Sequence, residues 1–415
     1  MIGSLYSGIS GLKANTSAMS VIGDNIANVD TTGFKSSRVS FANIFSASLS
    51  QNSLQIGRGV TLNGVNPQWE AGSLENTNNA TDLSINGSGL FMVKDPTNDI
   101  NFYSRAGKFE WDKDGSLVSP DGFVVQGYPI AANGTVGTID DIVLPNGTSA
   151  PSATQNFSFG MNLSSSATIG DTFTSSITSY DSLGTEVILD VQLTKVAAGW
   201  DWAVTPTPAT VSCATNGQIR FLATGELDPL TTQWREGAGA YATTPPDLTL
   251  TGLAPAASPQ TVTWNYLDTA GTASDGSITG YSSESAKTAQ TQDGYPSGSL
   301  QSVAVDEDGY FTGVYSNGSM IPFAQLALAD FASYSGLAKQ GSNLYAESLA
   351  SGQALIGPPN SAGMGSVAPS TLEMSNVDLG TEFVEMITTQ RAFQANSKVI
   401  TTSDEILNEL LNIKR

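Results

Sequence analysis

The sequence predicts an α+β protein with a long α-helix at each end and nested all-β domains between the two helices. Apolar residues recur every seven positions at both termini, which is typical of coiled-coil-like helices. Between them, alternating apolar residues and Asp-Gly or Asn-Gly turns indicate β-strands. A central stretch differs in composition, and 415 residues provide enough chain for two to four domains.

The first predicted helix lies in residues 1–30. Its apolar positions form a heptad seam about 35 Å long, at 1.5 Å per residue, with two weaker positions. The seam consists of Leu5, Leu12, Met19 and Ile26, interleaved at the same period by Ile2, Ile9, Thr16 and Gly23.

A polar connecting loop follows in the stretch NIANVDTTGFKSS, and residues 31–71 are expected to be a linker. Gly33 is predicted to adopt a left-handed conformation that ends or turns the chain. The loop motif comprises Asn25, Asn28, Thr32, Gly33, Phe34 and Lys35. We expect the two asparagines to satisfy backbone groups at the helix end, the phenylalanine to be an apolar anchor, and Lys35 and Arg38 to pair with acidic residues. The alternative is a polar loop without a special role.

The second predicted helix lies in residues 372–415, which with residues 1–30 would form a terminal helical domain. About 35 residues are expected to be helical, with Ser375, Asn376 or Asp378 as the cap. Its heptad positions are Leu372, Leu379, Met386, Phe393, Ile400 and Leu407, flanked by Val399, Ile406, Leu410 and Ile413.

The two seams are expected to pair with each other and with those of neighbouring copies. A single apolar stripe is more often the core face of an ordinary globular helix. Two such stripes at opposite ends of the chain favour the assembly interpretation, because a lone helix pair leaves part of each stripe in water. We therefore predict a subunit-assembly seam.

The inner β-domain is predicted from residues 72–146 and 285–371. Hairpin turns are expected at Asp114-Gly115, Asp121-Gly122, Asp308-Gly309 and Asn317-Gly318. The Asp-x-Asp-Gly triplets also match part of a calcium loop. Turn chemistry is favoured, because no glutamate stands at the twelfth position.

Residues 147–284 are predicted to be an inserted outer β-domain rich in Ser, Thr, Ala and Pro. Its expected core consists of Leu163, Phe173, Ile177, Val187, Leu189, Val191 and Leu193, with Trp200, Trp202 and Trp264 nearby. The chain then runs out through the inner domain and returns through it. This nesting predicts an elongated molecule with both termini at one end.

Composition excludes several classes of function. The formal charge is −21 with only 13% charged residues, which argues against nucleic acid and anionic membranes as partners. The chain has no histidine, so Ser-His and Cys-His nucleophiles and His-ligated zinc are excluded. We expect no enzyme activity, cofactor or metal, although a glycosidase with an Asp/Glu pair stays open. Cys213 is the single cysteine, so no internal disulfide forms.

The N-terminal stretch MIGSLYSGISGLKANTS has neither the basic region nor the apolar region of a cleavable signal peptide. No run of about 18 apolar residues is present, so no membrane insertion is expected. Any export is expected to use a route that reads no cleavable peptide.

Two long motifs carry a family resemblance. MIGSLYSGISGLKANTSAMSVIGDNIANVDTTGFK and SNVDLGTEFVEMITTQRAFQANSKVITTSDEILNELLNIKR resemble the two ends of flagellar rod and hook axial proteins. Two inner stretches, YSRAGKFEWDKDGSLVSPDGFVVQGYP and the segment from GLAKQGSNLYAES to SNVDL, are also similar to the family, the second especially to its hook members. Together they cover about two thirds of the chain, whereas residues 147–284 carry only a loose likeness.

The resemblance implies a subunit of a helical tubular polymer, the curved hook that links rod to filament, transmits motor torque and encloses the export channel. It implies rod, hook-cap and hook–filament junction proteins as partners, besides other copies of the chain. It further implies an extracellular place in the flagellum, reached through the flagellar type III export apparatus.

Three other identities are weighed. A distal rod protein would be straight and rigid, with little or no outer domain. A secreted β-rich adhesin or polar hydrolase would need no terminal heptad helices and would carry a signal peptide. A flagellin would have much longer terminal helices.

Overall fold

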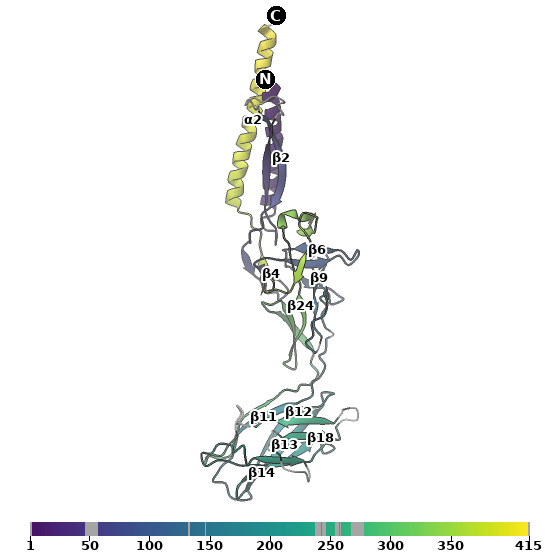
Figure 1. The fold of residues 1–415 in the computed structure, drawn as a ribbon, viewed down its shortest axis with the longest axis vertical. Coiled ribbons are helices and arrows are strands. Elements are labelled where there is room, and N and C mark those ends of the chain that lie inside the picture. Colours follow the sequence, from purple (N-terminus) through teal and green to yellow (C-terminus); the bar gives the residue numbers. More distant parts are fainter. Residues whose placement is uncertain are drawn as a thin grey trace, which may run out of the picture. The chain divides into compact units, whose positions relative to one another are not determined.

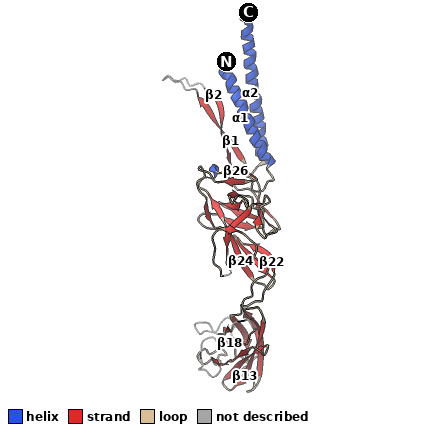
Figure 2. Cartoon of the chain, turned by 90° about the vertical axis from the view of Figure 1, so that its right-hand side faces the viewer, coloured by secondary structure: helices blue, strands red, loops and turns tan. Residues whose placement is uncertain are grey.

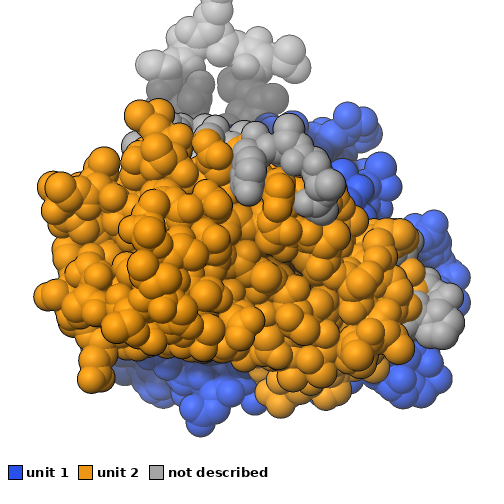
Figure 3. All heavy atoms as spheres, turned by 90° about the horizontal axis from the view of Figure 1, so that it is seen from below, with its two compact units in different colours: residues 1–145, 303–313, 321–415 blue, residues 146–302, 314–320 orange. Residues whose placement is uncertain are grey.

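The structure is a computed structural model that describes residues 2–45, 57–131, 133–145, 147–236, 242, 246–253, 257, 259–266 and 278–413. Internal contacts divide the chain into two compact units (Figure 3). The first comprises residues 1–145, 303–313 and 321–415, and the second comprises residues 146–302 and 314–320. The chain is mostly β-structure with one long helix near each end, as the sequence predicts.

The first unit contains both helices and a long hairpin. Helix α1 (Ile2–Ala27) packs against helix α2 (Leu379–Ile413) and against the hairpin formed by β1 (Ser37–Phe45) and β2 (Gly57–Pro67) (Figures 1 and 2). Strands β1 and β2 pair antiparallel, with two register shifts. Both strands lie within residues 31–71, which the sequence predicts to be a linker.

Helix α2 begins at Leu379 and contains 35 residues, which confirms the predicted length, although residues 372–378 of the predicted helical domain precede it. Residues Thr371–Glu373 form strand β30, which pairs with β3 (Leu74–Asn76). Asp378 then caps the helix, because its Oδ1 accepts a hydrogen bond from Thr381 N at 2.9 Å. Leu372, which fits the heptad, is therefore a strand residue rather than a helix residue.

The β-part of the first unit is built on a network of short strands. Its main path runs β22-β23-β24-β9-β5-β6-β27-β26, with β7, β8, β10, β25 and β28 joined to it; β4 pairs separately with β29. These strands are β4 (Leu83–Asn86), β5 (Leu90–Lys94), β6 (Asn101–Ser104), β7 (Glu110–Trp111), β8 (Leu117–Val118), β9 (Val124–Pro129), β10 (Asp140–Asp141), β22 (Leu300–Val305), β23 (Tyr310–Tyr315), β24 (Met320–Leu326), β25 (Leu328–Asp330), β26 (Ala338–Gly341), β27 (Leu344–Ala346), β28 (Leu355–Gly357) and β29 (Ser366–Pro369). A 3-10 turn, η1, spans Tyr334–Gly336.

The four predicted hairpin turns are confirmed. Gly115 and Gly122 connect β7 to β8 and β8 to β9, and Gly309 and Gly318 connect β22, β23 and β24. All four have positive φ, between 75° and 84°. Glycine adopts this conformation without a steric penalty, which explains the Asp-Gly and Asn-Gly pairs.

The second unit consists of two sheets. One has the order β15-β18-β19-β11-β20, with β21 paired to β11; the other has the order β12-β13-β14-β16-β17. The strands are β11 (Asn156–Asn162), β12 (Thr172–Tyr180), β13 (Glu186–Val196), β14 (Gly199–Thr207), β15 (Ser212–Cys213), β16 (Thr215–Ile219), β17 (Gln233–Glu236), β18 (Asp247–Thr251), β19 (Gln260–Trp264), β20 (Ile278–Thr279) and β21 (Ala286–Gln292).

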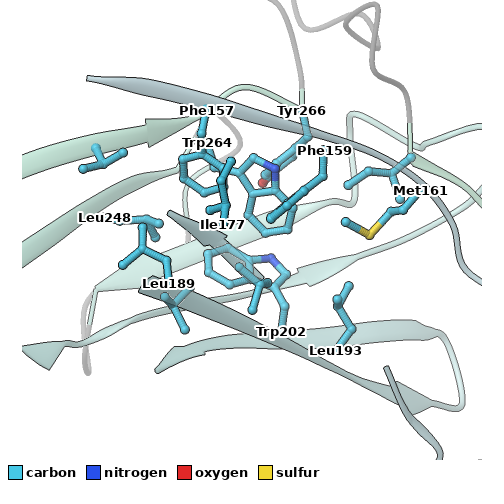
Figure 4. Packing of buried hydrophobic residues seen from close by; sticks show 14 of the residues in the cluster. Phe157, Phe159, Met161, Ile177, Leu189, Leu193, Trp202, Leu248, Trp264 and Tyr266 are labelled. Atoms are coloured by element: carbon cyan, nitrogen blue, oxygen red, sulfur yellow. The ribbon is translucent and has the colours of Figure 1, made fainter. Parts of the chain in front are cut away.

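The apolar core of the second unit lies between these sheets (Figure 4). Trp202 on β14 and Trp264 on β19 come from different sheets, and their ring centroids are 5.1 Å apart. Every core residue that the sequence predicts for this region belongs to the cluster, with Phe173 at its edge. Alternation of apolar and polar residues along β12 and β13 places one face of each strand inward.

The second unit extends past the boundary near residue 285 that composition predicts. Strand β21 pairs antiparallel with β11, so residues 286–292 belong to the same sheet. Their sequence AKTAQTQ is polar, and every residue of β21 is exposed. Hydrogen bonding to β11, rather than burial, places this strand, and a hydrophobic pattern therefore could not reveal it.

Candidate assembly site

The helices α1 and α2 run antiparallel and approach each other closely. A Cβ atom at Gly8 would lie 3.0 Å from Ile400 Cγ1, and one at Gly11 would lie 2.7 Å from Asn396 Nδ2. Near the other end of α1, Asn25 Nδ2 donates a hydrogen bond to Glu382 Oε1 at 2.9 Å. Glycine at the contact lets the two backbones come closer than larger residues permit.

The buried face of α1 is formed mainly by small residues, with Ile22 and the polar Asn25, instead of the predicted seam. Its buried positions follow helical spacing and are Gly8, Gly11, Ala14, Ala18, Ile22 and Asn25. Of the predicted seam, Leu5, Leu12, Met19 and Ile26 are half-buried and Ile9 is exposed. The side chain of Ile2 falls outside the described part. The large apolar residues of α1 are thus left partly open in a single copy.

Helix α2 carries both apolar and polar residues along its more sheltered side. Among the described side chains its less exposed positions are Glu382, Met386, Thr389, Asn396, Ser397, Ile400 and Ser403, most of them at heptad spacing. Two predicted seam residues, Met386 and Ile400, lie on this side. Phe393 and Leu379 of the same seam are exposed by 37% and 40%. The side chains of Leu407 and Leu410 fall outside the described part.

Further large apolar side chains of this region are exposed. On α2 they are Phe383, Val384, Ile387, Val399 and Ile406; on the hairpin they are Phe41, Ile44, Leu62 and Val65; on α1, Tyr6. A surface with so many exposed apolar side chains is typical of an interaction site.

Asn25 joins α1 to the start of β1. Its Oδ1 accepts a hydrogen bond from Ser37 N at 2.9 Å, and its Nδ2 donates to Ser37 O at 3.0 Å. Because Nδ2 also donates to Glu382, one buried side chain links α1, β1 and α2. Burial raises the pKa of the Glu382 carboxyl, which the hydrogen bond from Asn25 opposes and the charge of Glu385 reinforces.

The remaining loop residues also have defined partners. Asn28 Nδ2 donates to Asp24 O at 2.9 Å at the helix end, and Asn343 Nδ2 donates to Thr32 O at 3.0 Å. Gly33 has φ +70°, the left-handed conformation that the sequence predicts. A Cβ there would lie 2.5 Å from Ala106 N, so only glycine fits. Phe34 is buried.

Lys35 belongs to a buried ion cluster with Glu373 and Arg105. Lys35 Nζ lies 2.6 Å from Glu373 Oε1, and Arg105 Nε lies 2.5 Å from Glu373 Oε2. All three side chains are at least nine-tenths buried. Charges removed from water in this way require full pairing, and the cluster provides it.

Backbone groups complete the cluster. Lys35 Nζ donates to Glu70 O at 2.7 Å, and Glu373 Oε1 accepts from Gly72 N at 3.0 Å. The Arg105 guanidinium donates to the carbonyl oxygens of Ile85, Gly87 and Gly89. Burial raises the pKa of the Glu373 carboxyl, but the charge and hydrogen bond of Arg105, with those from Lys35 and Gly72, outweigh burial and lower it below 4.5.

Sequence reasoning anticipated an acidic partner for Lys35 but did not identify Glu373, Arg105 or the bridging role of Asn376. Asn376 Oδ1 accepts from Ser36 N at 2.8 Å, and its Nδ2 donates to Gln68 O at 2.9 Å. These contacts span more than 300 residues, so no local pattern could reveal them. Arg38 is exposed and has no ion pair among the described residues.

The described residues hold no group of three His, Cys, Asp or Glu side chains that could bind a metal ion. Among those same residues, no helix has the length and apolar character needed to cross a membrane.

Four family profiles match successive parts of the chain. They are described as Flagella basal body rod protein (residues 5–35), Flagellar hook protein FlgE/F/G D1 domain (84–169), Flagellar basal body protein FlaE D2 domain (170–295) and Flagellar basal body rod FlgEFG protein C-terminal (368–413). The buried ion cluster takes one residue each from the first, second and fourth matched segments.

Relatives match over essentially the whole chain. The Flagellar hook protein FlgE of Borreliella burgdorferi is 34% identical and that of Treponema pallidum is 33% identical, each over 100% of both chains. The Salmonella typhimurium protein of the same name is 33% identical over 98% of both. A solved structure, Helicobacter pylori flagellar hook protein FlgE2, covers 72% of this chain at 13% identity with a TM-score of 0.48, a weak likeness from which nothing further follows. The full-length identities show that this chain belongs to the flagellar hook protein family.

Proposed function

We propose that the chain is the structural subunit of the bacterial flagellar hook. Copies would polymerise through their terminal helices into a curved tube. The tube would serve as a flexible joint that transmits torque from rod to filament, and it would enclose the export channel.

One observation carries this proposal: the likeness to hook proteins extends from end to end, including both helices that expose apolar residues in a single copy. A helical polymer needs contacts in which each patch meets a different patch on the next copy. The half-buried Leu5, Leu12, Met19 and Ile26 on α1 and the exposed apolar residues of α2 supply such patches, in a coiled-coil-like arrangement between copies.

The hook is favoured over the distal rod within this family. A large second unit, matched by the D2 profile over residues 170–295, accords with the hook, whereas a rod subunit needs little or no outer domain. The relatives named above are all hook proteins. No observation favours an adhesin.

The same proposal assigns partners and place. Rod, hook-cap and hook–filament junction proteins would contact the ends of the polymer, and the flagellar type III apparatus would export the chain without a cleavable signal. The mature subunit would then lie outside the cell, in the hook of the flagellum.

Electron microscopy of the purified full-length chain, concentrated in high salt, tests the proposal beside a variant that lacks residues 1–30. Curved tubes from the full chain alone are expected. Straight tubes would favour the rod, and persistent monomers from both proteins would contradict polymerisation through the terminal helices.

A further inference from the structure

Leu349 is the most exposed large apolar residue of the described chain. Its relative exposure is 107%, more than in an extended reference peptide. It lies in the turn Ser348–Gly352, between β27 and β28. A single exposed leucine is ordinary. The hydrogen bonding of the turn that carries this leucine is not ordinary.

The turn places its polar side chains inward and its leucine outward. Ser351 is buried, with 1% exposure, and Ser348 Oγ donates to Gly336 O at 2.6 Å. Ser348 Oγ also accepts from Ala350 N at 3.0 Å, and Ser351 Oγ donates to Ser348 O at 3.0 Å. A Cβ at Gly336 would lie 2.3 Å from Ala350 C, so the turn rests directly on η1. The turn is therefore rigid before any partner binds, which lowers the entropy lost on binding.

The same unit contains a pocket of about 300 Å³ beside the connecting loop. Apolar atoms make up the larger part of its lining, from Val93, Ala106, Phe109, Pro120 and Leu344, with polar contributions from Thr31, Thr32, Lys108 and Asp121 among others. A buried leucine that is removed leaves a cavity on the order of 150 Å³. The pocket can therefore hold a leucine side chain and part of its turn. We call it the socket.

We propose that Leu349 of one copy inserts into the socket of a second copy of this chain. The proposal rests on the proposed function, because a homopolymer brings these two surfaces together at high local concentration. It adds a contact between β-domains to the contacts of the terminal helices.

The positions of the two features favour a head-to-tail contact. The turn that precedes β27 contributes Ser342 and Asn343 to the socket, and the turn that follows β27 carries Leu349. The two turns therefore lie at opposite ends of β27. A contact in which one patch meets a different patch on the next copy leaves one patch of each kind open for a further copy, as a tubular polymer requires.

Charges near the contact are complementary on one side. Glu347 is exposed two residues before Leu349, and Lys108 is exposed at the socket. Within the described residues, neither side chain takes part in an ion pair. Asp121 lies on the same rim, so we place Glu347 on the Lys108 side of the socket, where the approach is attractive.

Cysteine cross-linking in a Cys213→Ser background tests the contact, because Cys213 is the only cysteine. The variant Leu349→Cys/Ser119→Cys, with Ser119 in the socket, is oxidised during assembly. A ladder of dimers, trimers and higher species is expected. Each single variant is expected to give no ladder. The same is expected of the matched pair Leu230→Cys/Ser119→Cys, because Leu230 is also highly exposed, at 82%, but lies on the second unit. A product that stops at a closed dimer, or no product, would overturn the proposal.

Assembly measurements test the energetics. Leu349→Asp is expected to raise the critical concentration for tube formation about tenfold or more, whereas Leu230→Asp is not. Glu347→Lys and Lys108→Glu are each expected to weaken assembly, and the double variant to restore it. If wild-type tubes form and Leu349→Asp assembles equally well, only this contact is refuted. If the wild-type chain forms no tubes, the proposed function itself fails.

Discussion

At the residue scale, Glu373 joins three parts of the chain that are far apart in sequence. Its carboxylate binds Lys35 from the connecting loop and Arg105 from the β-part, and it stands six residues before the first residue of α2. The connecting loop is therefore fixed to the β-part at this point.

Glu373→Gln is expected to destabilise the first unit by about 3–5 kcal/mol, because Lys35 and Arg105 then remain buried without a countercharge. Urea unfolding followed by circular dichroism measures the change. Lys113→Gln is the control: its partner Asp114 lies 3.2 Å away and both side chains are largely exposed, so a change within about 0.5 kcal/mol is expected. Equal effects from the two variants would contradict the assignment of the cluster.

The lowered pKa of Glu373 also predicts a dependence on pH. A carboxyl with a folded pKa below its unfolded value of about 4.5 stabilises the fold fully above that pH. The stabilisation is lost as the pH falls through the folded pKa. The unfolding free energy of the wild type should therefore drop more steeply than that of Glu373→Gln between about pH 5 and pH 3. Parallel profiles would show that Glu373 is not responsible.

At the element scale, the two helices were predictable and their packing faces were not. Heptad spacing revealed the helices because a 3.5-residue period is a property of the sequence alone. The face that α1 turns toward α2 contains Gly8 and Gly11, which hydrophobic patterns do not detect. The start of α2 was predictable because Asp378, one of the three predicted caps, caps the helix. The pairing of β30 with β3 was not, because its residues lie almost 300 positions apart in the sequence. The ion cluster was missed for the same reason.

Gly11→Leu is expected to separate α2 from α1. Even the first atom of the new side chain would lie 2.7 Å from Asn396 Nδ2, and the remaining atoms would project further into α2. Amide hydrogen exchange along residues 386–400 should therefore become faster than in the wild type.

Gly23→Ala is the matched control, because a Cβ at Gly23 meets nothing within 4 Å. That variant should stabilise α1 by about 0.5–1 kcal/mol through helix propensity. Unchanged exchange in Gly11→Leu would refute close helix packing.

At the scale of the whole molecule, we propose that assembly and bending depend on different units. The first unit holds both terminal helices, the ion cluster and the socket, whereas the second has its own core between two sheets. Many of its exposed residues are Ser, Thr and Gln, with few long charged side chains. Polar surfaces of this kind suit contacts that slide when a tube bends, since large apolar interfaces hold one arrangement.

Removal of the second unit should therefore preserve assembly and change bending. Thr148 and Ser299 form an isolated antiparallel bridge, so their backbones lie about 5 Å apart. Residues 149–298 can thus be replaced by an Asn-Gly turn. This replacement removes β21 together with its partner β11, whereas a cut at residue 284 would leave β21 without that partner.

We expect the variant that lacks residues 149–298 to form tubes without the curvature of the wild type. Curvature and persistence length are measured from electron micrographs. Tubes as curved and as flexible as the wild type would exclude the second unit as the source of sliding contacts. Failure to assemble, with the first unit still folded by circular dichroism, would instead show that the second unit is needed to build the tube.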